Sequence, residues 1–128
     1  MARVKYEQSI VASVSNAADA TTRGAIDVRE RDGGLITIKM TNGATGPTVP
    51  CQARVMVAHT TGVTPATGAA GADWKTVEVF LGLTANSAVV ERKYDFGPAV
   101  KHVQVEFTGN TVQAVTVEAL ASTFNYSA

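Results

Sequence analysis

"VKHVQVEFTGNTVQAVTVEALA", residues 100–121, is the most regular stretch of the chain and decides its fold class. Valines recur at every second position on both sides of "TGNT", and small polar residues fill most of the gaps. This alternation is typical of β-strands with one buried face. Gly109 and Asn110 suit a tight reversal of the chain. The stretch therefore predicts two strands folded back on each other as a hairpin, and nothing in it indicates catalysis.

The same period of two continues along almost the whole chain. It predicts strands over 3–14, on both sides of "RDGG" at 31–34, and over 51–60, 74–83 and 88–97. The Asp-Gly pair predicts a second hairpin tip. The strand over 74–83 carries bulky side chains on both faces, which indicates a central strand or one covered by a neighbour. With no convincing helix, the pattern predicts an all-β fold: a single antiparallel β-sandwich of about eight strands, of Greek-key or jelly-roll type.

The length of 128 residues suits one domain, so we expect residues 1–128 to form a single sandwich. The N-terminal segment is expected to be a strand or an arm. The small and polar residues of 17–23 predict a loop. The stretch 61–73 is rich in Gly, Ala and Thr and offers almost no apolar anchor, which predicts a flexible or partner-ordered loop.

The composition narrows the possible partners. Charged residues make up 17% of the chain, and 11 basic residues balance 11 acidic ones. A neutral chain lacks the basic surface of a dedicated nucleic-acid binder, so no nucleic-acid partner is expected. A surface rich in Thr, Ala, Gly, Ser and Asn is easily desolvated, which favours packing against other proteins, including identical copies.

The chain has one cysteine, Cys51, which cannot form an intrachain disulfide and is expected to be buried. The N-terminal stretch alternates apolar and polar residues and has no continuous apolar core of the signal-peptide kind. No segment approaches the 18 or so apolar residues of a membrane-spanning helix. We therefore expect no signal peptide, no membrane contact, and a soluble protein made in the cytoplasm.

No set of residues predicts chemistry. His59 and His102 lack the spacing of zinc ligands, and each is expected at the surface. Glu30 and Asp32 are expected at an exposed hairpin tip. "TGAAGAD", residues 67–73, lacks the ending of a phosphate-binding loop. Trp74 is expected to pack at the core or its rim. The sequence therefore predicts no catalytic residue, metal ligand or cofactor, and no enzyme.

A family resemblance is carried by residues 73–80 and 86–119. This half resembles small β-sandwich virion proteins of tailed bacteriophages, in which a W-x-x-V/I…F strand precedes a Y-x-F/V-G segment and a closing V-x-V-x-x-T-G-N-T…V-T-V segment. The matching positions are Trp74, Val77, Phe80, Tyr94, Phe96, Gly97, Val103, Val105, Thr108, Gly109, Asn110, Thr111, Val115 and Val117. Val112 departs from the small residue usual after "TGNT". Residues 1–72 carry no such resemblance.

The resemblance implies an auxiliary virion protein, assembled in the host cytoplasm. It favours a head decoration or cement protein that binds the major capsid protein and forms a homo-oligomer, of which a trimer is one expected form. A neck or tail component, partnered by other virion proteins, is the alternative within this class. A carbohydrate- or receptor-binding jelly roll is the alternative outside it. The candidate subunit or capsid contacts are Arg3, Lys5, Glu7, Asp19, Arg23, Thr61, Val63, Pro65 and Asp73.

Overall fold

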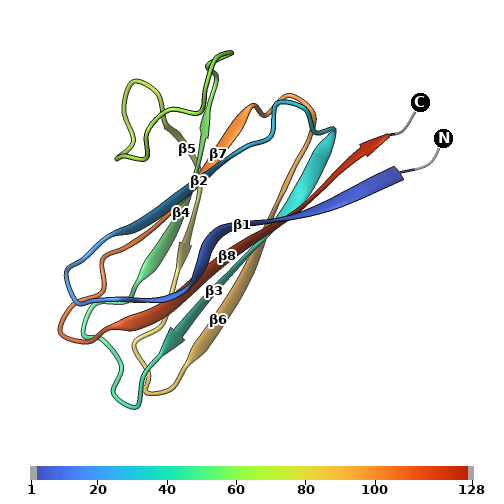
Figure 1. The fold of residues 1–128 in the computed structure, drawn as a ribbon. Coiled ribbons are helices and arrows are strands. Elements are labelled where there is room, and N and C mark those ends of the chain that lie inside the picture. The colour runs from blue at the N-terminus through green and yellow to red at the C-terminus, as the bar shows by residue number, and fades with distance from the viewer. Residues whose placement is uncertain (1–2, 127–128) are drawn as a thin grey trace.

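The computed structural model describes residues 3–126, which form two four-stranded antiparallel sheets packed face to face (Figure 1). Sheet A has the strand order β1-β8-β3-β6, and sheet B has the order β2-β7-β4-β5. The strands are β1 (Arg3–Asn16), β2 (Thr22–Asp27), β3 (Gly33–Asn42), β4 (Gln52–Ala58), β5 (Lys75–Leu81), β6 (Val89–Phe96), β7 (His102–Thr108) and β8 (Val115–Tyr126). The prediction of an eight-stranded antiparallel sandwich is confirmed.

The connections identify the sandwich as a jelly roll. Every step along the chain crosses from one sheet to the other, except that β4 is followed by its neighbour β5. Eight strands wound in this way form the two Greek keys of the jelly-roll fold. Of the two topologies that the sequence left open, the structure therefore selects the jelly roll.

Both predicted hairpins are wrong. β7 pairs with β2 and β4 in sheet B, whereas β8 pairs with β1 and β3 in sheet A, so "TGNT" joins opposite sheets. "RDGG" likewise joins β2 in sheet B to β3 in sheet A. The physical reason lies in the apolar faces. In opposite sheets Val105 and Val117 both point into one core, where both are fully buried.

The core between the sheets is mainly aliphatic. Ile36, Ile38, Val103 and Phe107 are among its fully buried side chains, at 0–1% exposure. Burying each such side chain stabilises the fold by about 1.5–3 kcal/mol. Cys51 is buried in the same cluster, as expected from sequence.

β5 is an edge strand, which contradicts its prediction as a central or covered one. In the described part of the chain it pairs with β4 alone. Phe80 packs against the core, but Val77, Val79 and Leu81 are 38–62% exposed. The two bulky faces of this strand therefore reflect one face turned to the core and one turned to solvent.

The loops gather at two ends of the sandwich (Figure 1). The arch end carries the connections 17–21, 43–51, 82–88 and 109–114. The terminal end carries the connections 28–32, 59–74 and 97–101 together with both termini. Residues 3–126 include no helix of the length and apolar character needed to cross a membrane.

Candidate interaction surfaces

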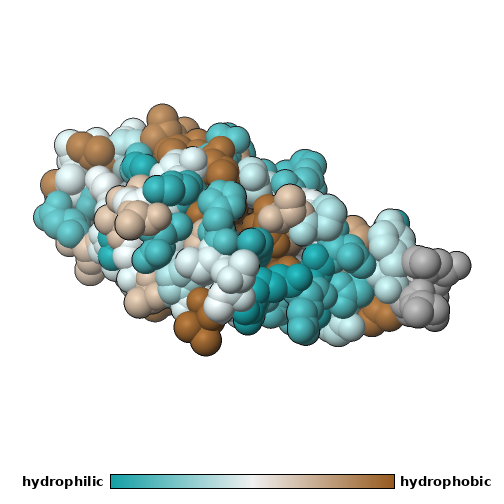
Figure 2. Space-filling view, turned by 90° about the horizontal axis from the view of Figure 1, so that it is seen from above, coloured by the Kyte–Doolittle hydropathy of each residue, from teal (hydrophilic) through white to brown (hydrophobic). Residues whose placement is uncertain are grey.

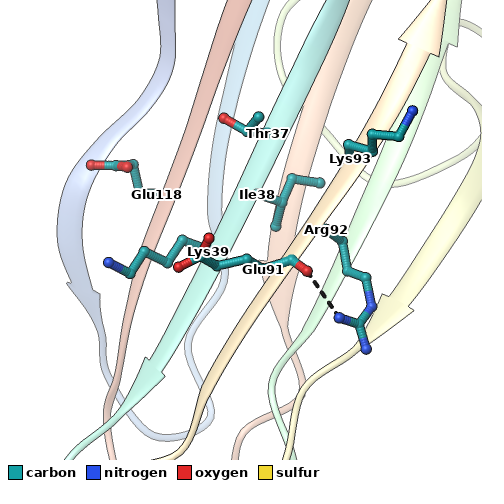
Figure 3. A pocket seen from close by; sticks show the side chains of 7 residues that line it. All are labelled: Thr37, Ile38, Lys39, Glu91, Arg92, Lys93 and Glu118. Atoms are coloured by element: carbon teal, nitrogen blue, oxygen red, sulfur yellow. Dashed lines mark hydrogen bonds between the residues drawn. The ribbon is translucent and has the colours of Figure 1, made fainter.

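The outer face of sheet A is polar and open. A depression of about 580 Å³ on this face is lined by Thr37, Ile38, Lys39, Glu91, Arg92, Lys93 and Glu118 (Figure 3). Lys39 of β3 stands in register between Glu91 of β6 and Glu118 of β8, so opposite charges alternate across the strands. Exposed pairs of this kind contribute little to stability. Their alternating charges do provide a pattern to which a partner with complementary charges can bind specifically.

The 59–74 loop covers the part of the outer face of sheet B around His102, Gln104 and Met56. Gln104 of β7 binds the backbone of Gly68 twice: its Oε1 accepts from the N–H at 2.9 Å, and its Nε2 donates to the carbonyl at 2.7 Å. The Trp74 indole donates to the carbonyl of Ala66 at 2.9 Å and packs with Met56 in a small second core. Trp74 is 2% exposed, which confirms its expected packing role. Trp74 thus anchors the end of the loop by apolar packing, and β7 holds its middle by hydrogen bonds.

His102 is a buried anchor of this loop, and the prediction of a surface histidine is wrong for it. Its Nε2 lies 3.1 Å from the Thr60 carbonyl, and its Nδ1 lies 2.9 Å from the Thr64 hydroxyl. A carbonyl can only accept, so Nε2 carries a proton and donates it to Thr60, and the Nδ1 atom shares a second hydrogen bond with the Thr64 hydroxyl. Alternation along β7 turns His102 away from the core, as predicted, but the loop closes over it. His59 is exposed, as expected.

A charged cluster lies on the same face of sheet B, next to the part that the loop covers. The Glu106 carboxylate of β7 is 8% exposed and accepts from Arg23 Nε at 2.7 Å. Arg54 of β4 approaches it from the other side, with Nε 3.7 Å from the second carboxylate oxygen. Two guanidinium groups around one carboxylate leave this patch with a net positive charge. It borders Val79, which is opposite Arg54 in the sheet register.

The arch end is tied together by a buried asparagine pair. Asn110 is fully buried, and its Oδ1 accepts from Asn16 Nδ2 at 2.6 Å. Its Nδ2 donates to the carbonyls of Asn16 and Gln113 at 3.1 and 2.9 Å. The "TGNT" segment therefore joins neighbouring loops through the hydrogen bonds of Asn110, and it is not a hairpin tip. Val112, two residues on, has φ 72°, a left-handed conformation that is strained for a β-branched residue.

Residues 3–126 contain no cluster of three or more His, Cys, Asp or Glu side chains able to hold a metal ion. Burial raises the pKa of the Cys51 thiol to about 11, which disfavours its reactive thiolate. The hydrogen bond from Arg29 lowers the pKa of Asp27 to about 2, so this carboxylate stays ionised in a surface ion pair.

The predicted contact residues fall on separate surfaces. Arg3, Lys5 and Glu7 lie on exposed β1. Arg3 stacks over the rings of Phe124 and Tyr126, with its guanidinium carbon 4.9 and 5.1 Å from their centroids.

The other predicted contact residues lie elsewhere. Asp19 is exposed at the arch end, and Arg23 belongs to β2 rather than to the preceding loop. Thr61, Val63, Pro65 and Asp73 lie together in the 59–74 loop, where Val63 is 85% exposed. Their role as contacts remains a prediction.

Sequence reasoning missed the largest run of exposed apolar side chains. Val77, Val79, Leu81 and Leu83 follow β5 toward the arch end, and Val89 opens β6 nearby; all are 38–62% exposed. The alternating apolar residues at 77, 79, 81 and 83 are visible in the sequence, but they predicted a central or covered strand instead of an exposed edge. Seen from the terminal end, hydrophobic groups are instead separated by hydrophilic side chains (Figure 2).

The strand order and the packing of the two sheets together define a jelly-roll β-sandwich. No protein-family model matches the chain, and no curated protein matches its sequence. Among solved structures, it resembles the SPBc2 prophage-derived protein YomS, with a TM-score of 0.53 and 16% identity over 98% of this chain and 96% of that one.

Two further structures show the same fold in other settings. One is the K3 cleaved adhesin domain of Lys-gingipain from Porphyromonas gingivalis W83, with a TM-score of 0.54 and 10% identity over 90% of this chain and 74% of that one. The other is the VP2 subviral particle of infectious bursal disease virus, with a TM-score of 0.50 and 9% identity over 97% of this chain. This chain spans 33% of that VP2 chain. At such identities the similarity shows the fold alone.

Proposed function

We propose that this protein is a non-enzymatic structural protein of a bacteriophage virion, and specifically a decoration or cement protein that binds the capsid and stabilises it as a homo-oligomer. The observation that carries the proposal is the match in fold to a prophage-derived protein along nearly the full length of both chains. The viral VP2 particle, with a domain of similar fold, supports the same class.

The physical properties of the molecule suit this role. Buried hydrogen bonds of Asn110 and Asn16 join loops at the arch end, and Gln104 fastens the 59–74 loop to sheet B. Such a body loses little conformational freedom when it binds, which favours affinity. A protein that binds the assembled shell but not its separated subunits stabilises the shell by mass action.

The same fold suits a neck or tail component, and the location in the particle distinguishes the two. Cryo-electron microscopy of the intact virion separates them directly: density on the capsid surface supports decoration, and density at the neck or tail supports the alternative.

The carbohydrate-binding alternative has weaker support. Sugar-binding modules use exposed aromatic platforms, whereas the one Trp of this chain is buried and its N–H is bonded within the protein. Tyr126 is 48% exposed, but Arg3 covers its ring. Binding of the purified protein to a glycan array at micromolar concentration would favour this alternative.

The decoration proposal is tested with shells assembled from the major capsid protein of the encoding phage, with and without this chain. We expect added density on the shell surface and a higher temperature of shell disassembly. Val63→Asp alters the predicted contact loop, and Val112→Asp alters an exposed valine at the arch end as the matched control. We expect the first variant to bind more weakly than the second. Shells without added density and with unchanged disassembly would reject the proposal.

A further inference from the structure

The two sides of the sandwich differ. On one side the edge strands β1 and β2 lie against each other. On the other side, β5 is the edge of sheet B and β6 is the edge of sheet A, and each has one strand neighbour among the described residues. An exposed edge strand offers unpaired backbone N–H and C=O groups to another chain. The β5–β6 side, which we call the open side, is therefore the place to look for a partner.

Two backbone groups on the open side are occupied only by their own neighbouring side chains. The N–H of Val79 donates to the carboxylate of Glu78 at 3.3 Å. The carbonyl of Glu91 accepts from the guanidinium of Arg92 at 2.9 Å (Figure 3). Both of these backbone groups therefore point to the free edges of their sheets. The N–H and the C=O of one residue in a strand point to the same side, so the second group of each residue also faces its free edge. Each edge thus has a donor and acceptor pair ready for a new strand.

We propose that two copies of this chain dimerise through the open side, with β6 of each copy pairing antiparallel with β5 of its partner. β5 runs from the terminal end to the arch end, and β6 runs in the opposite direction. A two-fold axis parallel to the strands keeps these directions and sets sheet A of one copy in line with sheet B of the other. One partner then pairs both free edges, so the assembly closes as a dimer.

The edge backbone groups define the register of this pairing. If Val79 exchanges hydrogen bonds with the partner's Glu91, then Leu81 stands opposite the partner's Val89. Leu81 is 62% exposed and Val89 is 48% exposed in the single chain. The pairing therefore brings two of the most exposed apolar side chains of the strands into contact, which removes apolar surface from water.

The charges agree with the same register. Glu78 stands opposite the partner's Arg92, and Lys75 lies beyond the register shift of β5 at Val77, so this one opposite-charge pair occurs twice in the dimer. Glu78 and Arg92 are the side chains that the new backbone bonds would release. A shift by two residues in either direction would remove this pair and place Glu78 opposite an uncharged residue, the partner's Val90 or the partner's Tyr94. Charge complementarity therefore selects one register among its neighbours.

This inference rests on the homo-oligomer included in the proposed function, and it names the surface and the symmetry. Sedimentation equilibrium of the full chain tests it: we expect a particle of two 13.3 kDa copies. Glu78→Arg and Arg92→Glu each place like charges at two symmetric positions and should weaken the dimer at least about tenfold. The double variant Glu78→Arg with Arg92→Glu should recover the dimer, because it restores both pairs in reverse.

Glu7→Arg is the matched control, because Glu7 is an exposed acidic residue on β1 at the other side of the sandwich. We expect it to leave the dimer intact. A monomer or a trimer for the unmodified chain, or a double variant no better than the single ones, would overturn the inference. Urea unfolding of each variant shows that the variant is folded before its mass is interpreted. Binding to capsid shells is measured separately, so a monomeric chain that still decorates shells would reject this inference alone.

Discussion

Replacing Asn110 by alanine tests the buried connection at the arch end. The side chain accepts one bond from Asn16 and donates one bond each to the carbonyls of Asn16 and Gln113, at 2.6–3.1 Å. A weaker contact reaches the carbonyl of Ala17 at 3.4 Å. Asn110→Ala removes all of them and leaves buried carbonyls without this donor.

The magnitude follows from these contacts. Three hydrogen bonds at a net value of about 1 kcal/mol each give about 3 kcal/mol. The space left by the amide adds about 1 kcal/mol, so we expect the free energy of unfolding to fall by about 3–4 kcal/mol. This is a large part of the 5–15 kcal/mol that is typical of a single domain.

Urea denaturation followed by tryptophan fluorescence measures this change, because Trp74 is buried in the folded state. Gln113→Ala is the control: it keeps the carbonyl that Asn110 binds and should cost less than about 1 kcal/mol. The reasoning is refuted if Asn110→Ala lowers stability by less than about 1 kcal/mol with an unchanged denaturant slope.

Further predictions concern four other residues. Val112→Gly should stabilise the fold by about 0.5 kcal/mol in urea, because it relieves the strain of φ 72°; a loss of stability would contradict this. Gln104→Leu should raise amide hydrogen exchange in the 59–74 loop at least about tenfold, since both bonds to that loop are lost; unchanged protection would count against the anchor. The pKa of Asp27 is lowered to about 2 in the folded state, below its usual 3.8, so its stabilisation is present above about pH 4 and is lost as the pH falls through about 2. Asp27→Asn should therefore flatten the decline of the melting temperature over this range, and an equally steep decline would show that other groups cause it. The thiol of Cys51, whose pKa is raised to about 11, should react with a disulfide reagent at pH 8 only after unfolding; rapid reaction of the folded protein would disprove its burial.

The strands and their buried faces were predictable from sequence. Alternating valines around residues 103–107 and 115–117 predicted both the strands and the side chains that enter the core. This works because successive side chains in a strand point to opposite faces, so a period of two records burial directly.

The partners of these strands were not predictable in the same way. "TGNT" and "RDGG" suit a reversal of the chain, but a reversal within one sheet and a crossing between sheets use similar residues. The choice depends on burying two apolar faces against each other. β7 and β8 therefore lie in different sheets although they follow one another in the sequence.

By itself, the sequence determined that this chain is an all-β sandwich with an aliphatic core, because the alternation of apolar residues is a local property. The tertiary structure alone decided the jelly-roll order, the burial of His102 and Gln104 beneath the 59–74 loop, and the exposure of Val79 and Leu81 at a free edge. Each of these depends on which distant segment covers a strand. A pattern within one strand can show that a face is apolar, but only the packed neighbours decide whether that face meets the core, a loop or water.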